Sequence, residues 1–360
     1  MSTEKIMGFP SLYIQGWEIL GSLPQRIANV FGCRRVAAII DPIVENIFTA
    51  LQPSPELTLS LVRFGGNCSM REVERLCSVA RAEAPEIIVG AGGGQALDAA
   101  KAVALRLGLP LVIVPTAASS DAPTSRLIAI YDDNHKITEV PVMNKNPDMI
   151  FVDTSVLIKA PKRLFVAGMG DAFTKRYEVR QAADNTRQRN YFGGLPPALS
   201  ATLAQCCHQV LLESGAEALR AVESGTPNDG FEHVVEASIL YSGLAFESGG
   251  LSVAHGMLRG LTAYPQTHAY LHGELVSYGL LVQLHAFGYE RQEMQKATTF
   301  LKSVGLPISK KDIGLQDAAS AEMMRIAELT LSAPYLSDSS QPLTANQIFD
   351  AMLAVEKHST

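Results

Sequence analysis

A short apolar run that ends in a glycine-rich segment constrains the fold of this 360-residue chain more than any other feature. Residues 86–89, Glu-Ile-Ile-Val, are followed at once by Gly-Ala-Gly-Gly-Gly at 90–94, and helical spacing runs from Leu97 to Leu107. A strand, a glycine turn and a helix in this order are typical of a βαβ unit in a parallel sheet. The segment therefore predicts an open α/β architecture.

The glycine segment also suits phosphate binding. Consecutive glycines let the backbone approach a pyrophosphate closely, and the helix that follows offers unpaired N–H groups and a positive dipole end. The spacing is neither G-x-G-x-x-G nor that of the P-loop, so a purely structural turn remains the alternative.

Further apolar runs extend this pattern. Residues 36–40, 59–64 and 111–114 have the composition of buried strands, and helical spacing covers 71–82. Strands that alternate with helices predict a Rossmann-like parallel sheet. From Arg163 onward no such strands recur. We therefore expect an α/β domain over 1–161 and an all-helical domain over 162–360, with helices over 198–218, 234–246, 273–287 and 345–356.

Composition and charge argue against several classes of protein. A net charge of -6 gives no basic footprint for nucleic acid, and no apolar run is long enough to span a membrane. The first residues lack the pattern of a signal peptide, and five cysteines without a C-x-x-C pair argue against a disulfide framework. Neither a nucleic-acid partner nor a membrane is expected, and a cytoplasmic location is the default.

Two loops follow predicted strands, where open α/β sheets bind their ligands. Asp41 ends the first strand and could accept hydrogen bonds from an adenosine ribose, or it could be a turn residue. Residues 115–125 are rich in hydroxyls: Thr116 and Ser119 could hold a phosphate or a nicotinamide amide, and Asp121 could orient a substrate hydroxyl. A helix-capping cluster is the alternative for this loop.

One carboxylate and two imidazoles stand beside glycines in the second half. They are Asp171 in Gly168-Met169-Gly170-Asp171, His255, and His272 in His272-Gly273-Glu274. Neutral imidazole and carboxylate suit Zn²⁺ or Fe²⁺, and three protein ligands leave a position open for substrate. His268 is a rival to His272, and isolated histidines are more often structural than ligating.

Several motifs together resemble one known family. They are Tyr13-Ile14-Gln15-Gly16, the glycine segment, Ser120-Asp121-Ala122-Pro123-Thr124-Ser125, Asn146-Pro147-Asp148-Met149, residues 166–172, residues 246–251, and the two histidine motifs. Across nearly its whole length the chain resembles the glycerol dehydrogenases of the iron-containing alcohol dehydrogenase superfamily. The resemblance implies a dehydroquinate synthase-like fold and a homo-oligomer.

The resemblance also implies roles for individual residues. Asp171, His255 and His272 would hold a catalytic metal, usually Zn²⁺, with Fe²⁺ suited to the same ligands. Asp121 would contact the polyol as a further catalytic residue, and Phe246 would line the substrate pocket. NAD would be bound by Gly92, Gly93, Gly94, Asp98, Thr116 and Ser119, with Ser125, Leu127 and Tyr131 nearby.

Three positions depart from the family pattern, which commonly has lysine where this chain has Gln95 and a second histidine where it has Leu258, next to Arg259. The expected reaction is NAD-dependent oxidation of glycerol to dihydroxyacetone. Arg126 or Arg259 could instead pair with the anionic group of a hydroxy acid or a phosphorylated polyol, although solvent exposure of both is the favoured interpretation. A non-catalytic NAD-binding protein is a third possibility.

Overall fold

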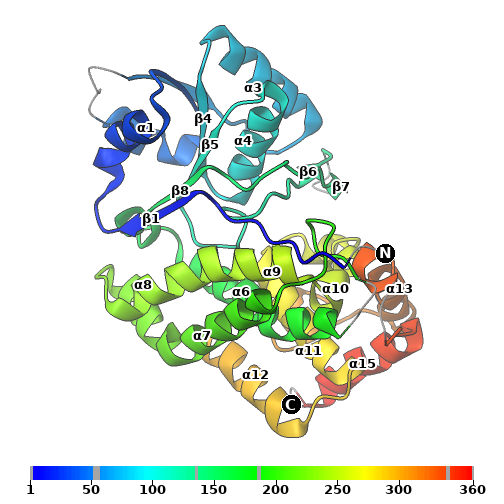
Figure 1. Cartoon of the computed structure of the whole chain (residues 1–360). Helices are drawn as coiled ribbons and strands as arrows, with labels where there is room; N and C mark the ends of the chain where they lie inside the picture. Colours follow the sequence, from blue (N-terminus) through cyan, green and yellow to red (C-terminus); the bar gives the residue numbers. More distant parts are fainter. Residues whose placement is uncertain (1–2, 52–56, 134–136, 185–187, 338–340, 359–360) are drawn as a thin grey trace.

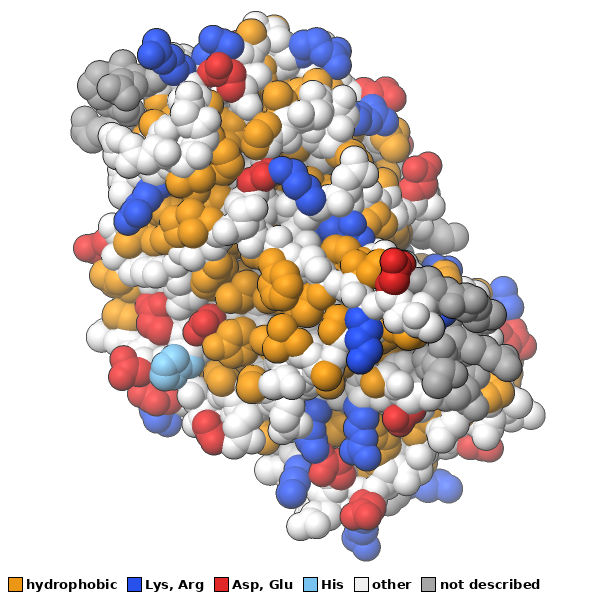
Figure 2. Space-filling model, in the orientation of Figure 1, with side chains coloured by type: hydrophobic (Ala, Val, Ile, Leu, Met, Phe, Trp, Pro, Cys, Tyr) orange, Lys and Arg blue, Asp and Glu red, His pale blue; other side chains and the backbone are white. Residues whose placement is uncertain are grey.

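The computed structural model describes residues 3–51, 57–133, 137–184, 188–337 and 341–358. Figure 1 shows a sheet with flanking helices above and a helical part, from α6 onward, below. The start of the chain lies beside the helical part, from which it runs back to the edge of the sheet. On the face drawn in Figure 2, acidic and basic side chains are interspersed around the periphery, with apolar side chains across the middle.

Six parallel strands form the sheet, in the order β1-β8-β5-β4-β2-β3. The strands predicted from apolar runs are confirmed as β2 (Arg35–Ile40), β3 (Thr58–Arg63), β4 (Ile87–Gly92) and β5 (Leu111–Pro115). Two strands that were not predicted, β1 (Leu12–Gly16) and β8 (Met149–Asp153), pair with each other and complete one side of the sheet. A short antiparallel ribbon, β6 (Ile130–Tyr131) and β7 (Ile137–Glu139), lies outside this sheet.

Alternate residues of the central strands enter two separate cores. On one face, Ile88 and Ile113 pack with the helices α3 (Met70–Ala82) and α4 (Gly94–Leu107). On the other face, Val89 and Val114 pack with α1 (Leu23–Phe31) and α2 (Glu45–Thr49). Coverage of both faces explains why the strands are apolar throughout rather than alternating.

The rest of the described chain is helical. Its elements are α5 (Thr154–Leu157), α6 (Lys162–Ala183), α7 (Ala198–Ser224), α8 (Asp229–Glu236), α9 (Ser242–Gly249), α10 (Val253–Leu261), α11 (His272–Ala286), α12 (Arg291–Val304), α13 (Ser320–Thr330), α14 (Pro334–Ser337) and α15 (Ala345–His358). Helix α6 packs against α7, α9 and α11 and is buried along most of its length. None of the described helices is long and apolar enough to cross a membrane.

The helix predicted over 234–246 is confirmed, but it is not α-helical throughout. A π-helical turn, Ala237–Tyr241, separates α8 from α9. The wider turn inserts an extra residue in the hydrogen-bonding ladder and changes which side chains face the neighbouring elements. Ser242 follows it directly and points at Asp121, with 2.8 Å between Oγ and Oδ2.

Candidate metal and cofactor site

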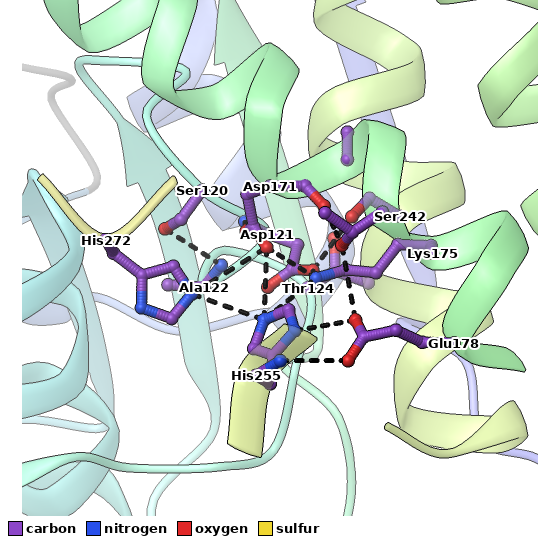
Figure 3. Close-up of polar contacts among 12 residues, drawn as sticks. Ser120, Asp121, Ala122, Thr124, Asp171, Lys175, Glu178, Ser242, His255 and His272 are labelled. Atoms are coloured by element: carbon purple, nitrogen blue, oxygen red, sulfur yellow. Dashed lines mark hydrogen bonds and ion pairs between the residues drawn. The ribbon is translucent and has the colours of Figure 1, made fainter. Parts of the chain in front are cut away.

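Three helices bring the predicted metal ligands together. Asp171 comes from α6, His255 from α10 and His272 from the first position of α11. Nε2 of His255 lies 3.3 Å from both Oδ1 of Asp171 and Nε2 of His272, and the third separation, from His272 Nε2 to Asp171 Oδ1, is 3.7 Å. Figure 3 shows the three side chains converging from separate elements.

The glycines beside these ligands allow the close packing. A Cβ at Gly168 would lie 1.9 Å from the carbonyl oxygen of Ala118, and one at Gly273 would lie 1.8 Å from that of Ala167. Any larger residue would force α6, α11 and the loop after β5 apart. The glycines beside the predicted ligands therefore allow three backbone segments to approach one another closely.

The ligand separations fit a tetrahedral ion. Ligands about 2.0–2.1 Å from such an ion lie about 3.3–3.4 Å from one another. Two of the three separations match that spacing, and the third is slightly wider. Asp171 and His255 are buried, whereas 46% of the His272 side chain is exposed. The set of three ligands is therefore open to solvent on the side of His272. The residues present thus fit a divalent metal with an open position.

Glu178, which the sequence analysis did not single out, orients His255. Its Oε2 lies 2.6 Å from Nδ1 of His255, and its Oε1 accepts hydrogen bonds from the backbone N–H groups of Ser252 and His255. The carboxylate assigns the proton to Nδ1 and leaves Nε2 for a metal. Burial opposes ionisation of Glu178, but His255 and Lys175 outweigh it and lower the pKa of the carboxyl.

Lys175 is the second residue that the sequence analysis missed. Its Nζ lies 2.5 Å from Oδ1 of Asp171, 3.1 Å from Oδ2 of Asp121 and 3.3 Å from Nε2 of His255. Although burial disfavours both charges, the ammonium and the two imidazoles hold the pKa of Asp171 well below its usual range, and the surrounding carboxylates raise the pKa of Lys175.

The spacing of Asp171, Lys175 and Glu178 is the signal that could have revealed the two missed residues. Positions i, i+4 and i+7 share one face of a helix, and the remainder of this helical stretch is largely apolar or small.

Asp121 joins the metal-ligand group from the loop after β5. Its backbone N–H lies 3.3 Å from Oδ2 of Asp171, and its carboxylate accepts a hydrogen bond from Ser242. Phe246, predicted to line the pocket, is buried, and its ring centroid lies 5.2 Å from Nζ of Lys175. Both residues thus lie beside the ligand set.

The predicted cofactor glycines lie where β4 meets α4. Gly92 has a φ of +148°, and a Cβ there would lie 2.9 Å from Cβ of Asp41. The structure thus brings Asp41, from the end of β2, beside the glycine turn, where its Oδ1 accepts a hydrogen bond from Ile43 N–H. Thr116 donates its backbone N–H to Gly92 O, so the loop containing Ser119 begins beside the same turn.

Gly93 is the N-cap of helix α4, and Gly94 is its first residue. No heavy atom would lie within 4 Å of a Cβ at Gly93, and Ala122 and Ser120 are the neighbours of Gly94, at 3.8 Å. The N-terminus of this helix is therefore open and faces the loop that also carries Asp121.

Asp98 lies in the first turns of α4, on the buried side of the helix. It is buried, and its oxygens accept hydrogen bonds from Nζ of Lys101 and the backbone N–H of Ala129, both at 3.0 Å. Lys101 also bonds the carbonyl of Leu127, so this pair fastens the 127–129 segment to α4. Ser125 is buried and Tyr131 half-buried in the same region. Contacts of these residues with NAD stay predictions.

Arg126 corrects the expectation that both Arg126 and Arg259 face solvent. It is 8% exposed, and its guanidinium lies 3.4 Å from Glu247, donates to the carbonyl of Tyr191 and stacks over Phe192. Arg259 is exposed, as predicted, one helical turn after His255. Gln95, another departure from the family pattern, accepts a hydrogen bond from Cys68 N–H, so it supports the fold of the α/β part.

Comparison with known proteins identifies the chain. A profile described as iron-containing alcohol dehydrogenase matches residues 10–154. A glycerol dehydrogenase of Thermotoga maritima is 37% identical over 362 residues, covering 97% of this chain and 96% of that protein. The chain belongs to the iron-containing alcohol dehydrogenase family. Like others of that family, it is an oxidoreductase, for which NAD and a divalent metal are implied.

Two further comparisons, one of structure and one of sequence, agree with this result. The crystal structure of the glycerol dehydrogenase of Schizosaccharomyces pombe superimposes with a TM-score of 0.91 at 31% identity, covering 99% of this chain and 92% of that one. The hydroxycarboxylate dehydrogenase A of Escherichia coli is 31% identical over 277 residues, covering 75% of this chain and 74% of that protein. The fold predicted from the sequence is confirmed.

Proposed function

We propose that this iron-containing alcohol dehydrogenase oxidises glycerol to dihydroxyacetone with NAD and Zn²⁺. The observation that carries the proposal is the convergence of Asp171, His255 and His272 beside Asp121, at the edge of the sheet where the glycine turn also lies. Full-length relatives named glycerol dehydrogenase support this choice of substrate. Fe²⁺ suits the same ligands.

The chain's own residues prepare the site. Glu178 fixes the tautomer of His255, so Nε2 is directed at the ligand group. Ser242 and Lys175 orient the carboxylate of Asp121, which is then placed to accept a hydrogen bond from a substrate hydroxyl. When bound, the metal would act as a Lewis acid toward the substrate oxygen, and NAD would accept the hydride.

The glycine turn would hold the pyrophosphate of NAD. Gly92, Gly93 and Gly94 leave the N-terminus of α4 open, and anions bind well at such a terminus. Asp41 would then accept hydrogen bonds from the adenosine ribose, and Thr116 and Ser119 would contact the nicotinamide half. In this arrangement domain 1–161 binds NAD, domain 162–360 binds the metal, and the substrate lies between them. The protein would act in the cytoplasm as a homo-oligomer.

A second substrate class is a 2-hydroxy acid. Arg259 is exposed on the helix that carries His255, and a hydroxycarboxylate dehydrogenase is among the relatives. The carboxylate of such a substrate would pair with this arginine.

One assay series tests both classes. The protein is purified, loaded with Zn²⁺ and assayed for NADH formation with glycerol, 2-hydroxy acids and glycerol phosphate. Glycerol is expected to give the highest kcat/KM. No glycerol-dependent NADH would refute the proposal. A preference for a hydroxy acid that disappears in Arg259→Gln would establish the second class.

A further inference from the structure

A buried ammonium touches the same oxygen that would ligate the metal. Lys175 has no exposed surface, and its Nζ contacts Oδ1 of Asp171, which is also the oxygen nearest both histidine Nε2 atoms. In Figure 3 its dashed lines lead to Asp121, Asp171 and His255. We propose that Lys175 is a resident cation of the metal centre, which holds Asp121 and Asp171 in place and weakens the binding of the divalent ion. This inference rests on the metal site of the proposed function.

Charge balance is the first argument. The carboxylates of Asp121, Asp171 and Glu178 are all buried, and a buried carboxylate requires compensation. Within the described ranges, Lys175 is the one lysine or arginine that forms an ion pair with any of these three carboxylates. The ammonium offsets the charge of one of the three carboxylates, and one divalent ion bound to neutral histidines would offset the other two. The lysine therefore makes the metal-loaded centre neutral.

Competition is the second argument. The ammonium of Lys175 and a metal ion would both bind Oδ1 of Asp171. Two positive charges at one carboxylate oxygen in a buried site repel each other strongly. Lys175 cannot retreat far, since it stands one helical turn from Asp171 on α6 and has the ring of Phe246 beside it. The ammonium must therefore share the site with the ion rather than leave it.

The same contacts give the lysine a role before the metal arrives. It bridges carboxylates from two different elements, Asp121 in the loop after β5 and Asp171 in α6. Without a cation, these two carboxylates would repel each other across the site. Lys175 is therefore a positioning residue that preserves the arrangement of ligands in the metal-free protein.

A purely structural lysine would behave differently, and the chain supplies a matched control. Lys101 is equally buried, and its Nζ lies 3.0 Å from Asp98. It lies in the α/β part, and its partners among the described residues are Asp98 and the carbonyl of Leu127 rather than the metal ligands. Lys101→Met removes a buried ammonium without changing the charge beside Asp171.

The experiment measures metal affinity and stability rather than turnover. Full-length wild type, Lys175→Met and Lys101→Met are stripped with a chelator and titrated with Zn²⁺ against a chromophoric competitor. Thermal unfolding is recorded with and without Zn²⁺. Lys175→Met is expected to bind Zn²⁺ at least tenfold more tightly than wild type, and Zn²⁺ should raise its Tm more. Lys101→Met should lower the Tm and leave Zn²⁺ affinity within a factor of two.

Each outcome decides the question. Equal or weaker Zn²⁺ binding by a folded Lys175→Met protein would overturn the inference. If that variant does not fold without metal, Lys175→Gln is titrated in the same way with the same expectation. Folding of both variants only in the presence of Zn²⁺ would support the inference, and failure to fold even with Zn²⁺ would overturn it. Absence of Zn²⁺ binding by the wild type would refute the proposed metal site itself.

Discussion

Oε2 of Glu178 lies 2.6 Å from Nδ1 of His255, and the other oxygen of the same carboxylate accepts two backbone N–H groups at the start of α10. Glu178 thus fixes both the ring of His255 and the helix that carries it. Glu178→Gln keeps the size of the side chain but loses the charge. We expect Zn²⁺ affinity to fall about 10–100-fold.

The measurement is a Zn²⁺ titration of the stripped protein, with Glu293→Gln as the control. Glu293 pairs with Arg176 and Tyr177, away from the metal ligands. Unchanged affinity in Glu178→Gln, or an equal loss in the control, would show that Glu178 does not orient the ligand.

Gly93 offers a test of cofactor binding that separates binding from folding. A Cβ at this position meets no heavy atom within 4 Å, and its φ of -82° suits any residue. Gly93→Ala should therefore keep the Tm of the wild type. If the NAD pyrophosphate packs on this backbone, the added methyl should raise the Kd for NADH at least tenfold.

Fluorescence titration with NADH measures this Kd. Gly108→Ala is the control, because Gly108 ends the same helix at a φ of +67°. This control should lose stability through backbone strain and keep its affinity. A Gly93→Ala protein with wild-type NADH affinity would place the pyrophosphate elsewhere.

The sequence was informative about most strands that are buried on both faces, although β8, which is equally buried, was not predicted. Apolar runs predicted β2, β4 and β5 because each is buried on both faces. It missed β1, all of whose residues are only half-buried and include Gln15, because such a segment lacks the signature of a central strand.

The burial of a side chain could not be predicted from the sequence where its neighbours come from distant segments of the chain. Lys175 and Glu178 are charged residues in a helix, which ordinarily face solvent. Arg126 is buried because Glu247, 121 positions later, is brought against it. Only the packing of α6 and α9 against the loop after β5 reveals these environments.

Arg126 supplies a further prediction. Burial raises the pKa of Glu247, whereas its bonds to Arg126 and Asn146 favour the ionised form. Arg126→Met would leave this fully buried carboxylate without its guanidinium partner, at a cost of about 3 kcal/mol in the free energy of unfolding. Urea denaturation measures the loss. Arg325→Met, which removes an exposed pair with Glu328, should cost less than about 1 kcal/mol.

The same variant tests whether Arg126 pairs with an anionic substrate. If Arg126 only supports the fold, the ratio of kcat/KM for glycerol to that for a 2-hydroxy acid should stay as in the wild type. A selective loss of activity on the acid would return Arg126 to the substrate pocket.

His208 predicts how stability depends on pH. Burial, followed by the nearby charge of Arg176, lowers its pKa from 6.5 to about 4, and its ring stacks on Phe173. The unfolded chain therefore binds a proton that the folded protein does not. This contribution is complete above pH 6.5 and is lost as the pH falls toward 4, by about 2 kcal/mol between pH 6.5 and 5.

Urea denaturation of wild type and His208→Gln at pH 7 and pH 5 checks the sign. The difference in unfolding free energy between the two pH values should be smaller in the variant. Parallel pH dependence in the two proteins would contradict the assignment.

The pairing of β1 with β8 has a consequence for synthesis of the chain. Leu12 lies opposite Met149, and Gln15 also bonds Glu232 in the helical part. The first strand to leave the ribosome therefore waits for partners made much later. Central strands β2, β4 and β5 can assemble before it, whereas the amino-terminal strand closes the molecule late, as expected for contacts between distant segments. A fusion at the amino terminus should thus affect the yield of folded protein more than the stability of its sheet.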